Sequence, residues 1–194
     1  MKHYARLDIF SDVRQDAADN RYAIVTAARQ LLVDEGPHVS MRTIAGAAKV
    51  GVATVTRHFP ERTDLYDAVS EQTLNDIVQI LDDHSVEFTV DTRKAWRDTI
   101  HAIGNLGLAA IAQGSAEKRA AEVREIYDGL LAPAKRAKLC PADLDPLELH
   151  FSLGIVSRPL PAPAPDVIRW DSLTHKMIDT LLDGWEAQAH SAEY

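Results

Sequence analysis

Four cationic side chains stand against one carboxylate, Glu61, between residues 37 and 62, although the whole chain has a formal net charge of −8. The four cations are Arg42, Lys49, Arg57 and Arg62. Guanidinium and ammonium groups bind phosphate oxygens, so this segment has the chemistry of a contact to a nucleic-acid backbone. A solvated basic surface without a partner is the other interpretation that charge alone allows.

The charge is divided unevenly along the chain. Residues 1–70 carry 9 basic and 9 acidic side chains, whereas residues 71–194 carry 12 basic and 20 acidic side chains. The whole acidic excess therefore lies in the later part, and binding to a polyanion is expected only of the early part.

Catalytic and metal-binding chemistry has no comparable support in the sequence. We find no glycine-rich phosphate loop and no nucleophile elbow, and the single Cys140 lies beside Pro141 without a neighbour that would activate it. Four later histidines lack the close HxxxH or HxxE type of spacing of metal ligands, and we assign them to core or surface roles: His84, His101, His150 and His175. No enzyme activity, cofactor or metal is expected.

Length and composition indicate a globular protein of one large or two small domains. The chain has 194 residues, of which 46% are hydrophobic and 26% are charged. Its longest segment without Asp, Glu, Lys or Arg, residues 99–116, is interrupted by glycines and polar residues and is too short to span a membrane. Because the start of the chain has no apolar signal core and there is one cysteine, a cytoplasmic location is expected.

Helices must position the cations. Apolar residues at helical spacing predict a helix from about Ala17 to Glu35, which Gly36 and Pro37 end. Ser40 is a candidate N-cap for a short second helix, and another short helix follows over residues 52–59 before Pro60. A fourth helix is predicted over residues 62–81, and residues 1–16 are expected to be a flexible arm or an added helical turn.

The remainder also has helical spacing, and we find neither strand-like alternation nor an internal repeat. The expected fold class is all-α. The expected helices cover residues 92–113, 116–131, 145–158 and 166–187, with an irregular piece over residues 133–139. Alternating prolines in residues 159–165 predict a stiff extended connector.

Residues 40–60, SMRTIAGAAKVGVATVTRHFP, predict a helix, a tight turn and a second helix. Ala45 and Ala48 are small, as is needed where two helices cross closely. This is the pattern of a helix-turn-helix, in which the second helix enters the major groove of DNA.

The segment resembles the TetR family of transcriptional regulators from about Asn20 through Val69, a quarter of the chain. The family run is close to I-A-x-x-A-G-V-S-x-x-T-L-Y-x-H-F, followed by proline and a basic residue. This chain matches it at Ile44, Ala45, Ala48, Val50, Thr54, Val55, His58, Phe59, Pro60 and Arg62.

The resemblance implies the domain organisation and the function. It implies an arm over residues 1–16, a helix-turn-helix DNA-binding domain over residues 17–62 with its motif at about 40–59, and a helical ligand-binding and dimerisation domain over residues 63–194. Such a protein would be a dimeric, ligand-responsive transcriptional regulator, most simply a repressor that binds a palindromic double-stranded DNA operator.

Individual roles in DNA binding follow from the motif. By resemblance, Thr54 and His58 would hold phosphates, while Val52 and Ala53 can touch thymine methyl groups and Arg57 can bind guanine or phosphate. The full predicted DNA-binding set is Ser40, Arg42, Thr43, Lys49, Gly51, Val52, Ala53, Thr54, Thr56, Arg57, His58 and Arg62.

Three residues depart from the family pattern. Lys49 replaces the turn glycine, Gly51 replaces a capping serine, and Thr56 replaces a tyrosine that reaches a phosphate. Together with the acidic later part, they leave a second hypothesis open: a helical small-molecule binding protein whose helix-turn-helix no longer engages DNA.

The last two predicted helices are unusually apolar, and the earlier one contains LHFSLGIV with almost no polar face. A second copy of the chain is the simplest cover for such surfaces, so we expect a homodimer built as a four-helix bundle. The predicted interface residues are Phe151, Ile155, Leu173, Met177, Leu181 and Trp185.

A ligand site is expected among the helices at 92–113, 116–131 and 145–158. Its predicted lining is Trp96, Ile100, His101, Ile103, Gly104, Tyr127 and Phe151. Gly104 and Gly107 are expected one helical turn apart, where they would make room for a small, largely apolar effector. Core packing alone would also explain the aromatic residues, and the acidic surroundings favour a neutral or cationic effector over an anionic one.

Overall fold

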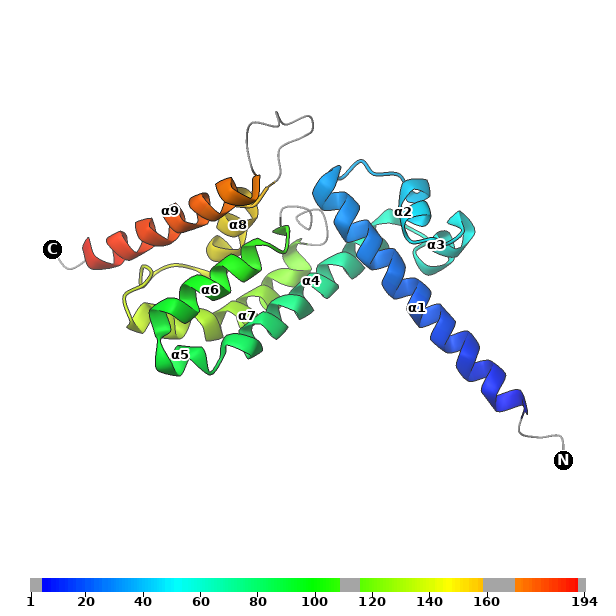
Figure 1. Cartoon of the computed structure of the whole chain (residues 1–194), viewed down its shortest axis with the longest axis horizontal. Coiled ribbons are helices and arrows are strands. Elements are labelled where there is room, and N and C mark those ends of the chain that lie inside the picture. Colours follow the sequence, from blue (N-terminus) through cyan, green and yellow to red (C-terminus); the bar gives the residue numbers. More distant parts are fainter. Residues whose placement is uncertain (1–4, 109–115, 159–169, 192–194) are drawn as a thin grey trace. The chain divides into compact units, whose positions relative to one another are not determined.

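The computed structural model describes residues 5–108, 116–158 and 170–191, and all the regular secondary structure in these ranges is helical (Figure 1). The predicted all-α class is confirmed. The contacts divide the chain into two compact units, Met1–Val69 and Ser70–Tyr194. No helix within the described ranges is long and apolar enough to cross a membrane.

The first unit is built on α1 (Ala5–Asp34), α2 (Met41–Ala47), α3 (Val52–His58) and the beginning of α4 (Arg62–His84). Helices α1, α2 and α3 contact one another. Each contributes fully or nearly fully buried apolar side chains to one core, among them Ile24, Ala28, Ile44, Val55 and Phe59. Packing in this core holds the short helices α2 and α3 against the long helix α1.

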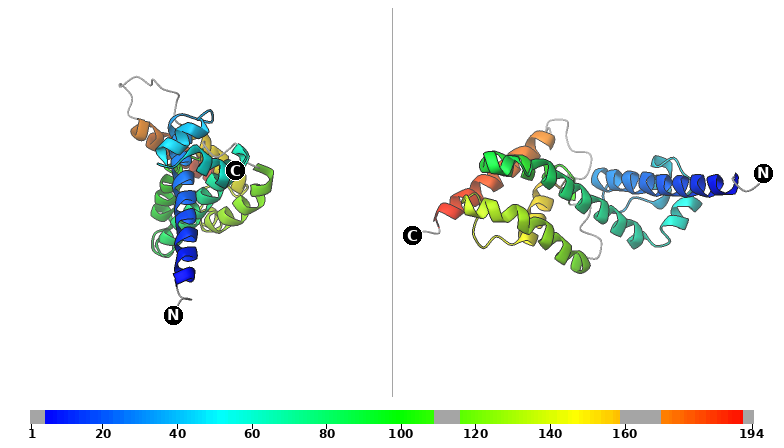
Figure 2. Two further views of the ribbon diagram at one scale, coloured as in Figure 1. Left: turned by 90° about the vertical axis from the view of Figure 1, so that its right-hand side faces the viewer. Right: turned by 90° about the horizontal axis from the view of Figure 1, so that it is seen from below.

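The second unit contains the rest of α4 together with α5 (Glu87–Val90), α6 (Thr92–Gly104), α7 (Ala116–Arg136), α8 (Pro146–Val156) and α9 (Trp170–Ser191) (Figures 1 and 2). Its core has buried contributions from every long helix in the unit. They include Ile77, Trp96, Ile100, Ile103, Tyr127, Leu131, Leu149, Leu153, Ile178 and Leu182.

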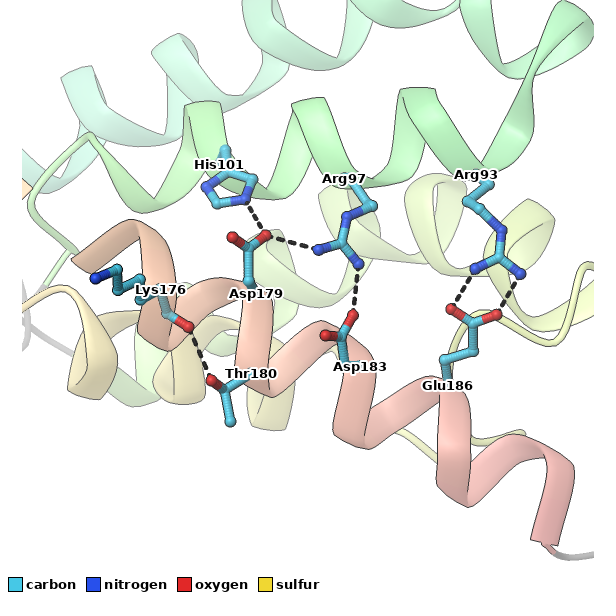
Figure 3. Close-up of polar contacts among 8 residues, drawn as sticks. All are labelled: Arg93, Arg97, His101, Lys176, Asp179, Thr180, Asp183 and Glu186. Atoms are coloured by element: carbon cyan, nitrogen blue, oxygen red, sulfur yellow. Dashed lines mark hydrogen bonds and ion pairs between the residues drawn. The ribbon is translucent and has the colours of Figure 1, made fainter. Parts of the chain in front are cut away.

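A row of charged contacts, which we call the α6–α9 seam, joins α6 to α9 (Figure 3). Arg97 binds Asp179 at 2.6 Å and Asp183 at 2.8 Å, and Arg93 pairs with Glu186. His101 Nε2 lies 2.9 Å from the same oxygen of Asp179, and its ring stacks on His175. The hydrogen bond with His101 and then that from Arg97 lower the pKa of Asp179. The two helices are therefore held antiparallel in a defined register.

Side chains and special backbone positions set the helix boundaries. The Ser40 side chain accepts from the Thr43 amide at 3.0 Å, as predicted, and Asp91 and Asp145 cap α6 and α8 in the same way. Gly36, with φ of 83°, follows the end of α1 in the left-handed conformation that glycine tolerates.

Several predicted boundaries were wrong. Helix α1 begins at Ala5 instead of about Ala17, so most of the expected arm is helical. Helix α6 ends at Gly104 instead of residue 113, and α7 continues through Pro133 to Arg136. The short helix α5 was not predicted. The predicted connector at residues 159–165 lies outside the described ranges.

A half-buried histidine, His150, contacts a buried tyrosine of the second core. Tyr127 is fully buried, and its hydroxyl lies 3.2 Å from His150 Nδ1. Burial lowers the pKa of His150 from 6.5 to about 4 and raises the pKa of Tyr127. The folded chain therefore keeps His150 neutral at pH values where an unfolded chain would charge it.

We expect the second unit to lose stability as the pH falls from about 6.5 to about 4, because the unfolded chain binds a proton at His150 that the folded chain does not. The free energy of unfolding attributable to this residue should fall by up to about 3 kcal/mol over that range. Urea unfolding followed by tryptophan fluorescence measures this unit, since all three tryptophans lie in it.

The variant His150→Gln has no titratable group at this position. Its free energy of unfolding should therefore depend less on pH between about 6.5 and 4 than that of the wild type. His190→Gln is the matched control, because His190 is exposed on α9. Equal pH dependence in wild type and His150→Gln would contradict the assignment.

Candidate nucleic-acid interface

The candidate interface consists of α2, the turn at residues 48–51 and α3. Within the turn, the amide of Lys49 donates to Gly46 O at 3.1 Å and that of Val50 donates to Ala45 O at 3.0 Å. These bonds close the end of α2, and α3 then begins directly after Gly51. The predicted helix, tight turn and helix are therefore present at the predicted residues.

Lys49 lies at the centre of this turn with φ of 57°, in the left-handed region. A residue with a β-carbon pays about 1 kcal/mol there relative to glycine. Its side chain is exposed, so a cation is held at the surface between α2 and α3.

Helix α3 has a clear inner and outer side. Val55 is fully buried, as is Phe59 directly after the helix, at 0% and 1% exposure. The opposite side carries the exposed residues Val52, Ala53, Thr56 and Arg57, which are adjacent on a helical surface because they lie at i, i+1, i+4 and i+5. We call these four residues the α3 outer face.

The remaining predicted DNA-binding residues surround this face. Ser40, Arg42 and Thr43 are exposed at the start of α2, where Ser40 Oγ lies 2.8 Å from Thr43 Oγ1. Thr54 and His58 are half-buried along α3. Gly51 is the N-cap of α3 and forms no side-chain cap, as expected for glycine in place of serine.

Arg62, which the sequence predicts to contact DNA, has a role within the protein as well. Its guanidinium donates to the Pro37 carbonyl at 2.7 Å, to the Val39 carbonyl and to the Tyr66 hydroxyl at 2.6 Å. The Tyr66 hydroxyl also donates to Pro37 O at 2.8 Å. Arg62 is thus committed to the segment between α1 and α2 and positions the motif from inside the unit.

Sequence reasoning missed this bond network and a second supporting cation. Arg21 on α1 lies over the Phe59 ring, with its guanidinium carbon 5.2 Å from the centroid. The carbonyl partners of Arg62, Pro37 and Val39, lie 25 and 23 residues before it in the chain, so helical spacing carries no signal for them.

The predicted ligand residues fall into three environments. Trp96, Ile100, Ile103 and Tyr127 are fully or nearly fully buried in the core of the second unit. His101 belongs to the α6–α9 seam. Phe151 is 47% exposed on α8.

Gly104 makes room for a neighbouring side chain instead of a ligand. A β-carbon there would lie 2.5 Å from Ile178 Cδ1, so the glycine allows α9 to approach α6. Gly107 lies beyond the end of α6 with φ of 70°, and the expectation that both glycines share one helix was wrong.

Three of the predicted dimer residues, Met177, Leu181 and Trp185, line a groove on α8 and α9. The groove has a volume of about 350 Å³ and is lined by Val156, Met177, Thr180, Leu181, Gly184, Trp185 and Gln188. Ile155 and Phe151, one turn apart on α8, are 75% and 47% exposed, while Leu173 is half-buried. Thr180, Gly184 and Gln188 were not predicted, although they repeat every four residues on the same side of α9.

Comparison with known proteins supports the division of the chain into a helix-turn-helix unit and a second helical unit. The family model for bacterial regulatory proteins of the tetR family matches residues 24–69. An HTH-type transcriptional regulator of Staphylococcus aureus is 35% identical over 83 residues, which are 40% of this chain and 45% of that protein. The chain thus matches less than half the length of these curated relatives.

Two solved structures are similar over most of the chain. A TetR transcription regulatory protein from Mycobacterium vanbaalenii is 25% identical, covers 89% of this chain and 98% of its own, and has a TM-score of 0.54. A TetR transcriptional regulator from Streptomyces coelicolor covers 85% and 97%, with 20% identity and a TM-score of 0.59, and shows the fold alone.

The fold and the motif define an all-α helix-turn-helix protein with a helical second unit. Residues 24–69 match the tetR family of bacterial regulatory proteins, and the fold of the chain is similar to that of solved TetR regulators. The resemblance stated from the motif residues is confirmed.

We expect Arg62→Ala to loosen α2 and α3, because three acceptors lose one charged donor. Such bonds contribute about 1.5 to 3 kcal/mol, so amide hydrogen exchange over residues 41–59 should accelerate about 10-fold or more. Arg62→Lys should recover only part of the protection, since an ammonium group lacks the guanidinium fork. Exchange in residues 70–194 serves as an internal reference.

Arg57→Ala is the control variant, because Arg57 is exposed on α3 and its loss should change stability by less than about 0.5 kcal/mol. Unchanged exchange in Arg62→Ala would show that the tether does not stabilise the motif.

Proposed function

We propose that this chain is a DNA-binding transcriptional regulator that reads an operator with the α3 outer face. The observation that carries the proposal is that four adjacent residues of α3 are exposed while Val55 and Phe59 anchor the opposite side. This is the arrangement that a recognition helix needs to enter a major groove. Exposed Arg42, Lys49 and Arg57 supply cations around it for phosphate or guanine.

Repression is the simplest regulatory outcome, because a protein bound at an operator blocks transcription there. A two-fold dimer would read a palindrome with half-sites about one helical turn, roughly 34 to 36 Å, apart. Binding to chromosomal DNA also agrees with the cytoplasmic location expected from the sequence.

The test of DNA binding is a titration of duplex DNA that flanks the protein's own gene, at several salt concentrations. Arg57→Ala should weaken binding to DNA by about 1 to 3 kcal/mol. If sequence preference is lost at one base pair only, Arg57 contacts guanine. If affinity falls equally for all sequences and depends less steeply on salt, Arg57 contacts phosphate. Lys49→Gly should also reduce the salt slope by about 1, yet make the first unit about 1 kcal/mol more stable.

Lys49→Gly should weaken the contact to DNA but stabilise the first unit. Because the two effects are opposite, the variant separates a role in DNA binding from a role in folding. Val78→Ala is a control, because Val78 is exposed on α4 in the second unit. Absence of sequence-preferring binding to any duplex would favour the alternative, a helical small-molecule binding protein whose helix-turn-helix does not engage DNA.

We also propose that the chain forms a homodimer through α8 and α9. An interface with two-fold symmetry must be self-complementary, since each copy presents the same patch. Here, exposed Phe151 and Ile155 project from α8, and the groove along Met177, Leu181 and Gly184 lies on the same helix pair. In a two-fold dimer, exposed apolar side chains of one copy can fill the groove of the other copy, and the reverse.

Ile155→Glu should release folded monomers, because it places a charge at the most exposed apolar position of α8. Sedimentation at micromolar concentration measures the change, and Leu181→Glu should act in the same direction. Val90→Glu is the matched control, since Val90 is 84% exposed on α5, away from α8 and α9. A monomeric wild type would contradict the dimer.

A small, largely apolar effector that weakens DNA binding is the third element of the proposal. Its support is a set of three buried polar atoms on α6, for which the described residues provide no hydrogen-bond partner: Trp96 Nε1, Thr99 Oγ1 and His101 Nδ1. Buried polar groups are normally paired, so an acceptor on a ligand among α6, α7 and α8 would satisfy the indole N–H. The neighbouring side chains Ile100, Ile103 and Tyr127 are mainly apolar.

A panel of small neutral and cationic apolar compounds, screened by release of the DNA duplex, tests the effector. An effective compound should shift operator affinity by about 5- to 150-fold, which corresponds to a coupling of 1 to 3 kcal/mol. Trp96→Phe keeps an aromatic ring but removes the N–H, so it should weaken the response while leaving DNA affinity unchanged. A response that survives Trp96→Phe intact would place the effector elsewhere.

A further inference from the structure

The α3 outer face is unusually poor in groups that can hydrogen-bond to bases. Val52 is 44% exposed, and Ala53 beside it is exposed as well. Arg57 is the one charged residue among the four, and Thr56 is the one other polar residue. Most of the surface that α3 presents is therefore aliphatic.

The hydroxyl of Thr56 is already used inside the helix. Thr56 Oγ1 donates to the Val52 carbonyl at 3.2 Å, across one helical turn. The hydroxyl hydrogen is thus not offered to a base or a phosphate, and the methyl group of Thr56 remains for apolar contact. Its neighbours on the helical surface are Val52 and Ala53.

Gly51 extends this flat aliphatic surface at the start of α3. Its φ is −71°, which any residue adopts, and a β-carbon there would meet only Thr54 Oγ1 at an ordinary 3.8 Å. The fold therefore does not require glycine at this position. What the missing side chain provides is a close approach of Val52 and Ala53 to whatever lies against α3.

We infer that the operator half-site is read mainly through thymine methyl groups, which pack against Val52, Ala53 and the methyl of Thr56, with Arg57 as the one hydrogen-bonding reader on this face. This inference rests on the proposed DNA-binding function. The thymine C5-methyl is the apolar group that the major groove displays, and aliphatic side chains are its natural contacts. Such a face has few means of identifying adenine or cytosine by hydrogen bonds.

Replacement of thymine by uracil tests the inference, because uracil pairs identically and lacks only the methyl group. The duplex flanking the gene is used, with the thymines of one half-site replaced one at a time. Affinity should fall about 3- to 5-fold at each of one to three positions, as expected for the loss of one buried methyl group. Thymines outside the half-sites should show no change and provide the internal control.

Protein variants assign the contacts. In Val52→Ala, the thymine-to-uracil difference should vanish at one position and persist at the others, while Val78→Ala, the exposed valine of α4, should keep all of them. Both substitutions are at exposed sites and leave the core intact.

Three failures can be distinguished. Binding with a sequence preference but no thymine-to-uracil difference at any position would overturn this inference and leave the proposed function standing. Absence of binding to every duplex would overturn both. If Val52→Ala keeps the thymine-to-uracil difference in affinity at every position, the assignment of these contacts to the α3 outer face is wrong.

Discussion

The burial of Val55 and Phe59 beneath α3 is the interaction on which the rest of the first unit depends. A helix of seven residues is too short to be stable by itself in water, so α3 exists because its inner side is packed. The same packing decides which residues point outward. The orientation of the α3 outer face is therefore a consequence of how two apolar residues are packed against α1 and α2, with Arg21 over the Phe59 ring.

Around this core, polar groups hold the connecting segments. Arg62 and Tyr66 satisfy backbone carbonyls between α1 and α2, and Ser40 satisfies an amide at the start of α2. Buried or half-buried backbone groups need such partners, since loops lack the internal bonds of helices. The sequence predicts that Ser40 and Arg62 contact DNA. In the structure, both residues also form hydrogen bonds that position the motif within the protein.

The sequence alone predicted much of this arrangement. The helix-turn-helix was located to within one residue at the end of α3 because its signals are local: a capping serine, two small residues at the crossing, and a proline after Phe59. Helical spacing also identified the apolar side of α9. The roles of Gly104 and His101 could not be predicted in this way, because they depend on Ile178 and Asp179, which are more than 70 residues distant in the chain.

In the proposed complex, two copies of this chain present α3 to one DNA duplex. Selection of bound duplexes from a random pool tests it most directly, since the recovered sequences give site length, symmetry and half-site spacing together. We expect enriched palindromes whose half-site centres lie about 10 base pairs apart. Enrichment of a single asymmetric site, or no enrichment at all, would contradict it.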